Sequence, residues 1–263
     1  MRLLPFSMGE LKQLQINYDR DKQIHYGFLP RIYDQNQDPF KANRNYLHTY
    51  VERDLRQLIR VKDLGLFENF LRLLSGRIGQ IANLHSISND LGVSSPTISQ
   101  WLSILEASFI IFRLTPYFEN FGKRIIKSPK IFFTDVGLAS YLLGIENPEQ
   151  VSRDPLLGGL FENLVVMEAI KARLNKGLDP NLYFYRDNNG NEVDLLFRKH
   201  NLLVPIEIKA AMTYNDNLVK GIRYFQKISY KATKGFLVYA GEMEFNRSEY
   251  RVVNFRETCD VVG

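Results

Sequence analysis

The stretch that decides the fold runs from residue 192 to residue 209 and reads EVDLLFRKHNLLVPIEIK. Residues 192–198 and 203–210 carry short patterns rich in Val, Ile, Leu and Phe, which predict two β-strands. The connection between them, Lys199 to Asn201, is short enough to pair the strands antiparallel. We therefore expect a two-stranded ladder at the centre of this part of the chain.

Three ionisable side chains that could bind a metal or act in catalysis fall on this predicted ladder. Because side chains alternate across a strand, Glu207 and Lys209 share one face, and the pairing allows Asp194 to lie on that face too. The opposite face takes the apolar residues Val193, Leu195, Phe197, Val204, Ile206 and Ile208. The sequence thus predicts two carboxylates and one ammonium group close together.

Such a group of side chains suits divalent-metal chemistry. Carboxylate oxygens are hard ligands for Mg²⁺ or Mn²⁺, and the bound ion lowers the pKa of its water and neutralises phosphate charge. A neighbouring lysine can orient or deprotonate that water. The non-catalytic alternative is a solvated Glu-x-Lys pair, which is common on strands.

A helix predicted for about 160–174 precedes the strands and contains Glu162 among apolar residues. A charge there is costly unless it is paired or bound to metal, so Glu162 is a candidate metal ligand. We interpret the nearby acids Glu168, Asp187 and Glu192 as solvated or capping residues. Further elements are expected in the order strand 182–186, the two strands above, helix 215–228, strand 235–239 and an extended piece at 251–255.

The region before residue 143 is expected to be mainly helical. Two helices between 46 and 74, interrupted at Gly65, precede a helix-turn-helix pattern at 84–107 with Gly92 in the turn. Its inward positions are Ile87, Leu91, Val93, Ile98 and Trp101. A strand at about 109–117 follows and suggests a winged helix, and residues 144–157 are the predicted linker.

A helix-turn-helix is often a DNA reader, and Thr97 and Gln100 on its second helix are the candidates for base contacts. That helix begins without Arg or Lys, so the phosphate attraction that dominates affinity must come from elsewhere. The candidates are the basic-loop residues Lys123, Arg124, Lys127 and Lys130. A winged helix used purely as a scaffold is an equally weighted reading.

Composition excludes several classes of protein. With 263 residues, 45% hydrophobic and 24% charged, the chain is expected to be globular and cytoplasmic, without a signal peptide or membrane span. The single cysteine, Cys259, cannot form an internal disulfide. A net charge of +5 is compatible with a polyanionic partner but too mild to establish one.

Three segments together resemble the PD-(D/E)XK nuclease superfamily: Glu162, then Glu192-Val193-Asp194, then Pro205-Ile206-Glu207-Ile208-Lys209. The resemblance implies an α-β-β-β-α-β core with Mg²⁺ or Mn²⁺ held by Asp194 and Glu207. It also implies water activation by Lys209 and an auxiliary metal role for Glu162. The catalytic residues would then be Asp194, Glu207 and Lys209.

A wider resemblance covers residues 27–227. Segments such as Tyr50-Val51-Glu52-Arg53-Asp54-Leu55 and Ser128-Pro129-Lys130-Ile131-Phe132-Phe133 are similar to the uncharacterised region that follows the ATPase module in many prokaryotic AAA-type ATPases. No Gly-x-x-x-x-Gly-Lys-Ser/Thr loop occurs in the sequence, so we expect no ATP site in this chain.

The sequence therefore predicts an α+β multidomain protein. Residues 1–44 would be the end or remnant of an ATPase module, 45–143 a helical and winged-helix domain, and 156–263 an α/β PD-(D/E)XK nuclease-like domain. Three functions compete: a metal-dependent nuclease acting on DNA or RNA, a catalytically inactive nucleic-acid binding module, and a protein-interaction adaptor for a separate ATPase.

Overall fold

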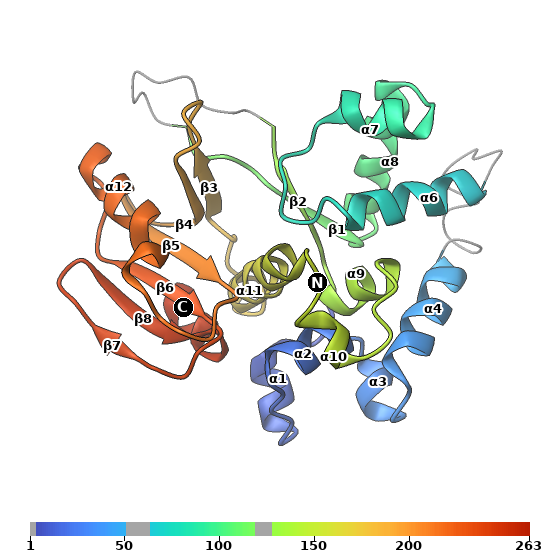
Figure 1. Ribbon diagram of the computed structural model, residues 1–263, viewed down its shortest axis with the longest axis horizontal. Coiled ribbons are helices and arrows are strands. Elements are labelled where there is room, and N and C mark those ends of the chain that lie inside the picture. The colour runs from blue at the N-terminus through green and yellow to red at the C-terminus, as the bar shows by residue number, and fades with distance from the viewer. Residues whose placement is uncertain (1–3, 51–63, 119–127) are drawn as a thin grey trace.

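The C-terminal part of the molecule is built on a mixed β-sheet (Figure 1). The computed structural model describes residues 4–50, 64–118 and 128–263. Within these residues the sheet has six strands in the order β3-β4-β5-β6-β8-β7. Their bounds are β3 (Leu182–Arg186), β4 (Glu192–Lys199), β5 (Leu202–Lys209), β6 (Gly235–Tyr239), β7 (Phe245–Asn246) and β8 (Tyr250–Asn254). The expected strands are confirmed, with ends that differ by a few residues at most.

The direction of the strands changes at β5. It pairs antiparallel with β4 but parallel with β6, and β6 pairs parallel with β8. A parallel partner requires a crossover, which the chain makes through the 3₁₀ turn Asp216–Val219 and helix α12 (Lys220–Ile228). The predicted helix at 215–228 is therefore confirmed, with a first turn that is 3₁₀ rather than α.

Helix α11 (Leu157–Leu174) occupies the centre of the molecule, between the sheet and the N-terminal helices (Figure 1). It is apolar on nearly all sides, which is typical of a helix enclosed by other elements. Val165, Val166 and Ile170 are completely buried. The short C-terminal helix α13 (Thr258–Val262) also packs against α11.

The N-terminal half is mainly helical (Figure 1). Its helices are α1 (Met8–Gln13), α2 (Arg20–Tyr26), α3 (Pro30–Asp34), α4 (Pro39–Tyr50), α6 (Leu64–Ser75), α7 (Leu84–Leu91), α8 (Ser95–Ala107), α9 (Val136–Leu142) and α10 (Pro148–Val151). Helix α6 begins at Leu64, next to the break expected at Gly65, and residues 51–63 before it lie outside the described residues. No helix in the described part of the chain is long and apolar enough to cross a lipid bilayer.

Helices α7 and α8 form the tight two-helix unit expected from the sequence. Gly92 ends α7 at φ 68°, a left-handed conformation that glycine adopts without strain. Ser94 caps α8 by accepting a hydrogen bond from the Thr97 amide. Ile87, Ile98 and Trp101 are buried as expected, whereas Leu91 and Val93 are half-buried.

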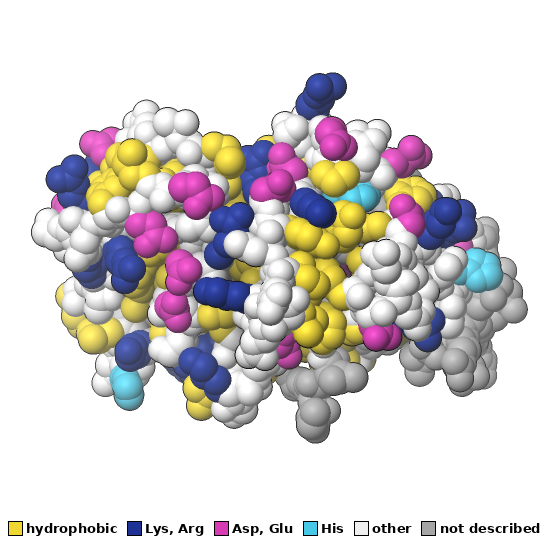
Figure 2. Space-filling view, turned by 90° about the horizontal axis from the view of Figure 1, so that it is seen from below, with side chains coloured by type: hydrophobic (Ala, Val, Ile, Leu, Met, Phe, Trp, Pro, Cys, Tyr) yellow, Lys and Arg dark blue, Asp and Glu magenta, His cyan; other side chains and the backbone are white. Residues whose placement is uncertain are grey.

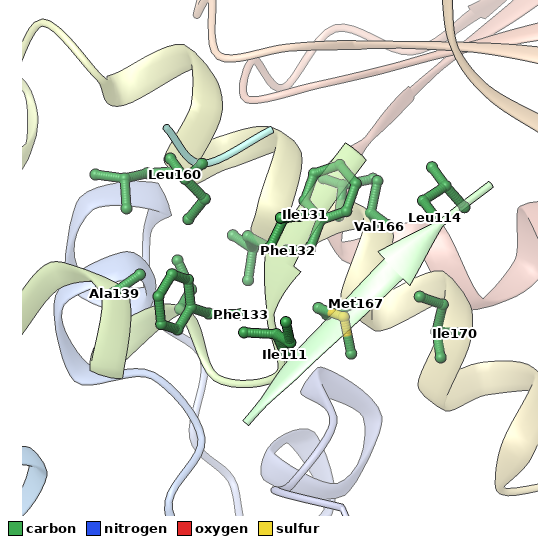
Figure 3. Packing of buried hydrophobic residues seen from close by; sticks show 14 of the residues in the cluster. Ile111, Leu114, Ile131, Phe132, Phe133, Ala139, Leu160, Val166, Met167 and Ile170 are labelled. Atoms are coloured by element: carbon green, nitrogen blue, oxygen red, sulfur yellow. The ribbon is translucent and has the colours of Figure 1, made fainter. Parts of the chain in front are cut away.

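A two-stranded ribbon, β1 (Ile111–Leu114) and β2 (Lys130–Phe133), connects this unit to α11. Figure 3 shows Ile131, Phe132 and Ile111 of the ribbon packed among Val166 and Met167 of α11. Beyond β1, the backbone of Pro116 bridges to Phe184 in β3. The ribbon therefore belongs to the same hydrophobic core as the sheet.

The first 44 residues also join this core. Leu11, Ile24 and Phe28 are each at most 1% exposed. The Met8 amide donates a 2.7 Å hydrogen bond to Glu168, whose carboxylate also accepts one from Lys171 at 3.0 Å. Glu168 is completely buried, so its interpretation as a solvated or capping residue was wrong. One continuous core thus spans all three predicted units. Val151, which lies in the predicted linker, is also buried in this core.

Candidate active site

Asp194, Glu207 and Lys209 converge where β4 and β5 run side by side. The Lys209 Nζ lies 2.6 Å from Asp194 Oδ2 and 2.5 Å from Glu207 Oε2. Asp194 Oδ2 also accepts a 2.8 Å hydrogen bond from the backbone amide of Ile208. The side chains of Asp194 and Glu207 are 12% and 5% exposed, whereas the Lys209 side chain is 32% exposed. The expected juxtaposition of these three residues is present.

A β-bulge at this point arranges the carboxylate of Asp194. The register of β3 against β4 shifts between Tyr183 and Tyr185, and the β4–β5 ladder begins at Leu195 opposite Ile206. Val193 therefore belongs to the small hydrophobic cluster that contains Phe225 of α12, while Leu195 and Phe197 belong to the main core. The expectation that these three share one face was wrong, because a bulge breaks strict alternation.

The N-terminal turn of α12 closes over Glu207. A Cβ atom built on Gly221 would overlap both Glu207 Oε1 and the backbone carbonyl oxygen of Glu192. Glycine allows the helix backbone to approach the carboxylate this closely. Sequence reasoning missed Gly221, although a lone glycine inside a predicted helix is a signal of close approach.

Glu162 enters the site from α11 and meets a second lysine. Lys130 Nζ lies 2.7 Å from Glu162 Oε1 and 2.5 Å from Glu192 Oε1. Glu192 also binds Arg186 at 3.0 Å. Glu162 thus has the ionic partner that its apolar helix requires, and Glu192 is a member of the cluster instead of a solvated acid.

Lys130 differs from its predicted role. It was expected to contribute phosphate affinity from an exposed basic loop, but the residue is 2% exposed and is the first residue of β2. The half-buried acids Glu162 and Glu192 account for its position, since both pair with its ammonium group. Its place directly before the apolar run Ile131-Phe132-Phe133 is the sequence signal that could have indicated burial.

The carboxylates of the site differ strongly in proton affinity. Burial and the neighbouring Asp194 raise the pKa of Glu207 well above its usual range, although Lys209 opposes them. Burial also acts to raise the pKa of Asp194, but Lys209 and Lys130 outweigh it and lower that pKa to about 2. Burial raises the pKa of Glu162 to about 7 against the opposing charge of Lys130. One acid is therefore firmly ionised beside two that hold protons more readily.

The donor set fits a magnesium-like ion. Asp194 and Glu207 carry hard oxygen ligands that lie close together, since the Lys209 ammonium group contacts both carboxylates. Within the described ranges, no three acidic, His or Cys side chains are grouped so that they could hold a metal by themselves. Mg²⁺ commonly binds through one or two carboxylates and completes its shell with water and substrate phosphates, so two ligands are sufficient.

The remaining predicted site residues lie apart from this cluster or outside the described residues. Gln100 is exposed on α8, and Thr97 is half-buried with its hydroxyl 2.8 Å from that of Ser94. Lys123, Arg124 and Lys127 fall within 119–127, which the structure does not describe.

Two family descriptions match the sequence. Residues 17–149 match "Domain of unknown function (DUF8612)", and residues 157–258 match "Domain of unknown function (DUF4143)". No solved structure matches the chain.

Curated relatives extend over both regions. An uncharacterized protein of Mycobacterium tuberculosis is 31% identical over 216 residues, which cover 81% of this chain and 47% of the relative. An uncharacterized protein of Haemophilus influenzae is 25% identical over 215 residues, covering 77% of this chain and 50% of the relative. The chain spans about half the length of the curated relatives it matches. Since the first description covers half of its length, the chain belongs to the DUF8612 family and continues into a region similar to DUF4143.

Proposed function

We propose that residues 156–263 form a PD-(D/E)XK nuclease-like unit that binds Mg²⁺ or Mn²⁺ and hydrolyses phosphodiester bonds. The observation that carries the proposal is the meeting of Asp194 and Glu207 with Lys209 at 2.6 and 2.5 Å. The element order α11, β3, β4, β5, α12, β6 supports it, because it is the order that the resemblance implies.

Each residue of the cluster has a role that its surroundings support. Asp194 and Glu207 would hold the ion, which when bound lowers the pKa of a coordinated water and offsets phosphate charge. Lys209 would orient the attacking water, since its ammonium contacts both carboxylates and remains one-third exposed. Glu162 would line the site from the side of α11, where its carboxylate pairs with Lys130.

The relatives are longer than the region that matches this chain, which leaves room in them for a further module. The wider resemblance implies that this region follows an AAA-type ATPase module, and the matched relatives are about twice as long as the aligned region. We propose that such a module, in the same protein or as a separate partner, supplies the ATP chemistry that this chain is not expected to perform.

A cleavage assay tests the proposed reaction. Wild-type protein is incubated with supercoiled plasmid, single-stranded DNA and RNA in Mg²⁺, in Mn²⁺ and in EDTA. We expect metal-dependent cleavage of at least one substrate that Asp194→Ala and Lys209→Met abolish. Replacing the exposed acid Glu146 by Ala is the matched control and should leave cleavage unchanged. Cleavage that persists in Asp194→Ala would show that a contaminant or another site is responsible.

Binding of duplex DNA by the α7–α8 unit is a second candidate function. The exposed Gln100 on α8 favours it, since its amide can read an adenine edge. Figure 2 shows Lys and Arg interspersed with Asp and Glu on the lower face of the molecule in Figure 1, whereas α7 and α8 lie at the top of Figure 1. Fluorescence anisotropy with Gln100→Ala tests the proposal, and an affinity equal to wild type would favour the scaffold reading.

A further inference from the structure

Lys130 brings a positive charge into the candidate site from outside the nuclease-like unit. It lies in β2 opposite Leu114, and its side chain is 3% exposed. Its Nζ is within 2.7 Å of both Glu162 on α11 and Glu192 on β4. The same nitrogen lies 5.5 Å from the centre of the Phe184 ring. The ammonium group therefore bridges two acids that belong to two different elements.

The carboxylate of Glu162 is enclosed on its other side. Gly79 has φ +70°, and a Cβ atom there would stand 3.0 Å from Glu162 Oε2. The backbone amide of Gly79 donates to the carbonyl of Ile131, which fixes this loop against β2. One oxygen of Glu162 thus meets Lys130, and the other faces the backbone of Gly79.

The charges of the network favour a small number of additional cations. Among the described residues, its acids are Asp194, Glu207, Glu162 and Glu192, and its cations are Lys130, Lys209 and Arg186. Four negative and three positive charges sum to −1 when every group is ionised. One divalent ion would change this sum to +1, and a second would change it to +3. Like charges at this density in a buried site are costly, so one ion is favoured.

We propose that Lys130 is a resident cation of the site. It occupies the space between Glu162 and Glu192 that a second divalent ion would need, so the site takes a single ion at Asp194 and Glu207. Lys130 is in this account a positioning residue, because its ion pairs are with Glu162 and Glu192 and not with Asp194 or Glu207. The identity of the ion rests on the proposed function, whereas the Lys130 bridge does not.

Metal stoichiometry and thermal unfolding test the inference together. Full-length wild type, Lys130→Met and the exposed-lysine control Lys227→Met are dialysed against Mn²⁺, and bound metal is measured per folded chain. Wild type and Lys227→Met should hold about one ion, and Lys130→Met about two. In EDTA, Lys130→Met should melt at a lower temperature than wild type, and Mn²⁺ should raise its melting temperature more, because a second ion binds the folded state.

A further variant keeps the test decisive if Lys130→Met does not fold without metal. Adding Glu162→Gln to Lys130→Met removes the acid that needs the lysine, so this double variant should fold in EDTA and bind about one ion. Two ions in wild type or in the double variant would overturn the inference, and so would an unchanged metal response in Lys130→Met. Wild type without bound Mn²⁺ would refute the proposed function itself.

Discussion

The raised pKa of Glu162 predicts that this residue makes stability depend on pH. Its pKa rises from an ordinary 4.5 to about 7 in the folded protein. Each tenfold change in proton affinity is worth about 1.4 kcal/mol, so the effect amounts to roughly 3 kcal/mol of unfolding free energy. The unfolded chain releases this proton near pH 4.5, while the folded protein keeps it until about pH 7. The contribution is therefore complete below pH 4.5 and is lost as pH rises through 7.

Urea unfolding in EDTA at pH 4, 5, 6, 7 and 8 measures this contribution. The difference in unfolding free energy between wild type and Glu162→Gln should decrease by roughly 3 kcal/mol across the series, since glutamine does not titrate. Glu146→Gln, on the exposed surface, should run parallel to wild type. If the difference in unfolding free energy between wild type and Glu162→Gln stayed constant with pH, the raised pKa of Glu162 would be refuted.

Other predictions concern the core, the helix over Glu207 and the loop outside the described residues. Lys171→Met removes the ionic partner of the buried Glu168 and should destabilise the protein by about 3–5 kcal/mol in chemical denaturation, whereas a change below 1 kcal/mol would show that this pair contributes little. Gly221→Ala should displace Glu207 and weaken Mn²⁺ binding, measured by calorimetry, while Gly158→Ala, which meets nothing within 4 Å, should not. Replacing the loop cations by alanine should weaken DNA binding and flatten its salt dependence in an anisotropy titration, and an unchanged salt slope would contradict this. The cations replaced are Lys123, Arg124 and Lys127.

Much of the C-terminal architecture could be predicted from local sequence pattern. Short apolar strand patterns along 192–198 and 203–210 located β4 and β5, and side chains alternate between the two faces of such a strand. The same alternation placed Glu207 beside Lys209, and the short connection brought Asp194 to them. These relations depend on residues close in sequence, where strand geometry is decisive.

Relations between distant segments were harder to predict. Lys130 lies 32 residues from its partner Glu162, and no local pattern distinguishes a lysine that pairs with a buried acid from one on a solvated loop. The burial of Glu168 depends on Met8 and Lys171, the first of which lies 160 residues away. The bulge at Asp194 depends on how β3 pairs with β4, so alternation in β4 could not reveal it.

Isothermal titration of Mn²⁺ into metal-free protein tests most directly whether Asp194 and Glu207 form a metal site. Wild type should give a saturable binding heat, and Glu146→Ala should reproduce it. Asp194→Ala removes one of two carboxylate ligands and should lower the affinity by more than about 100-fold, so that no binding heat remains in the same concentration range. Binding by Asp194→Ala with wild-type affinity, or no binding by wild type at all, would contradict the account.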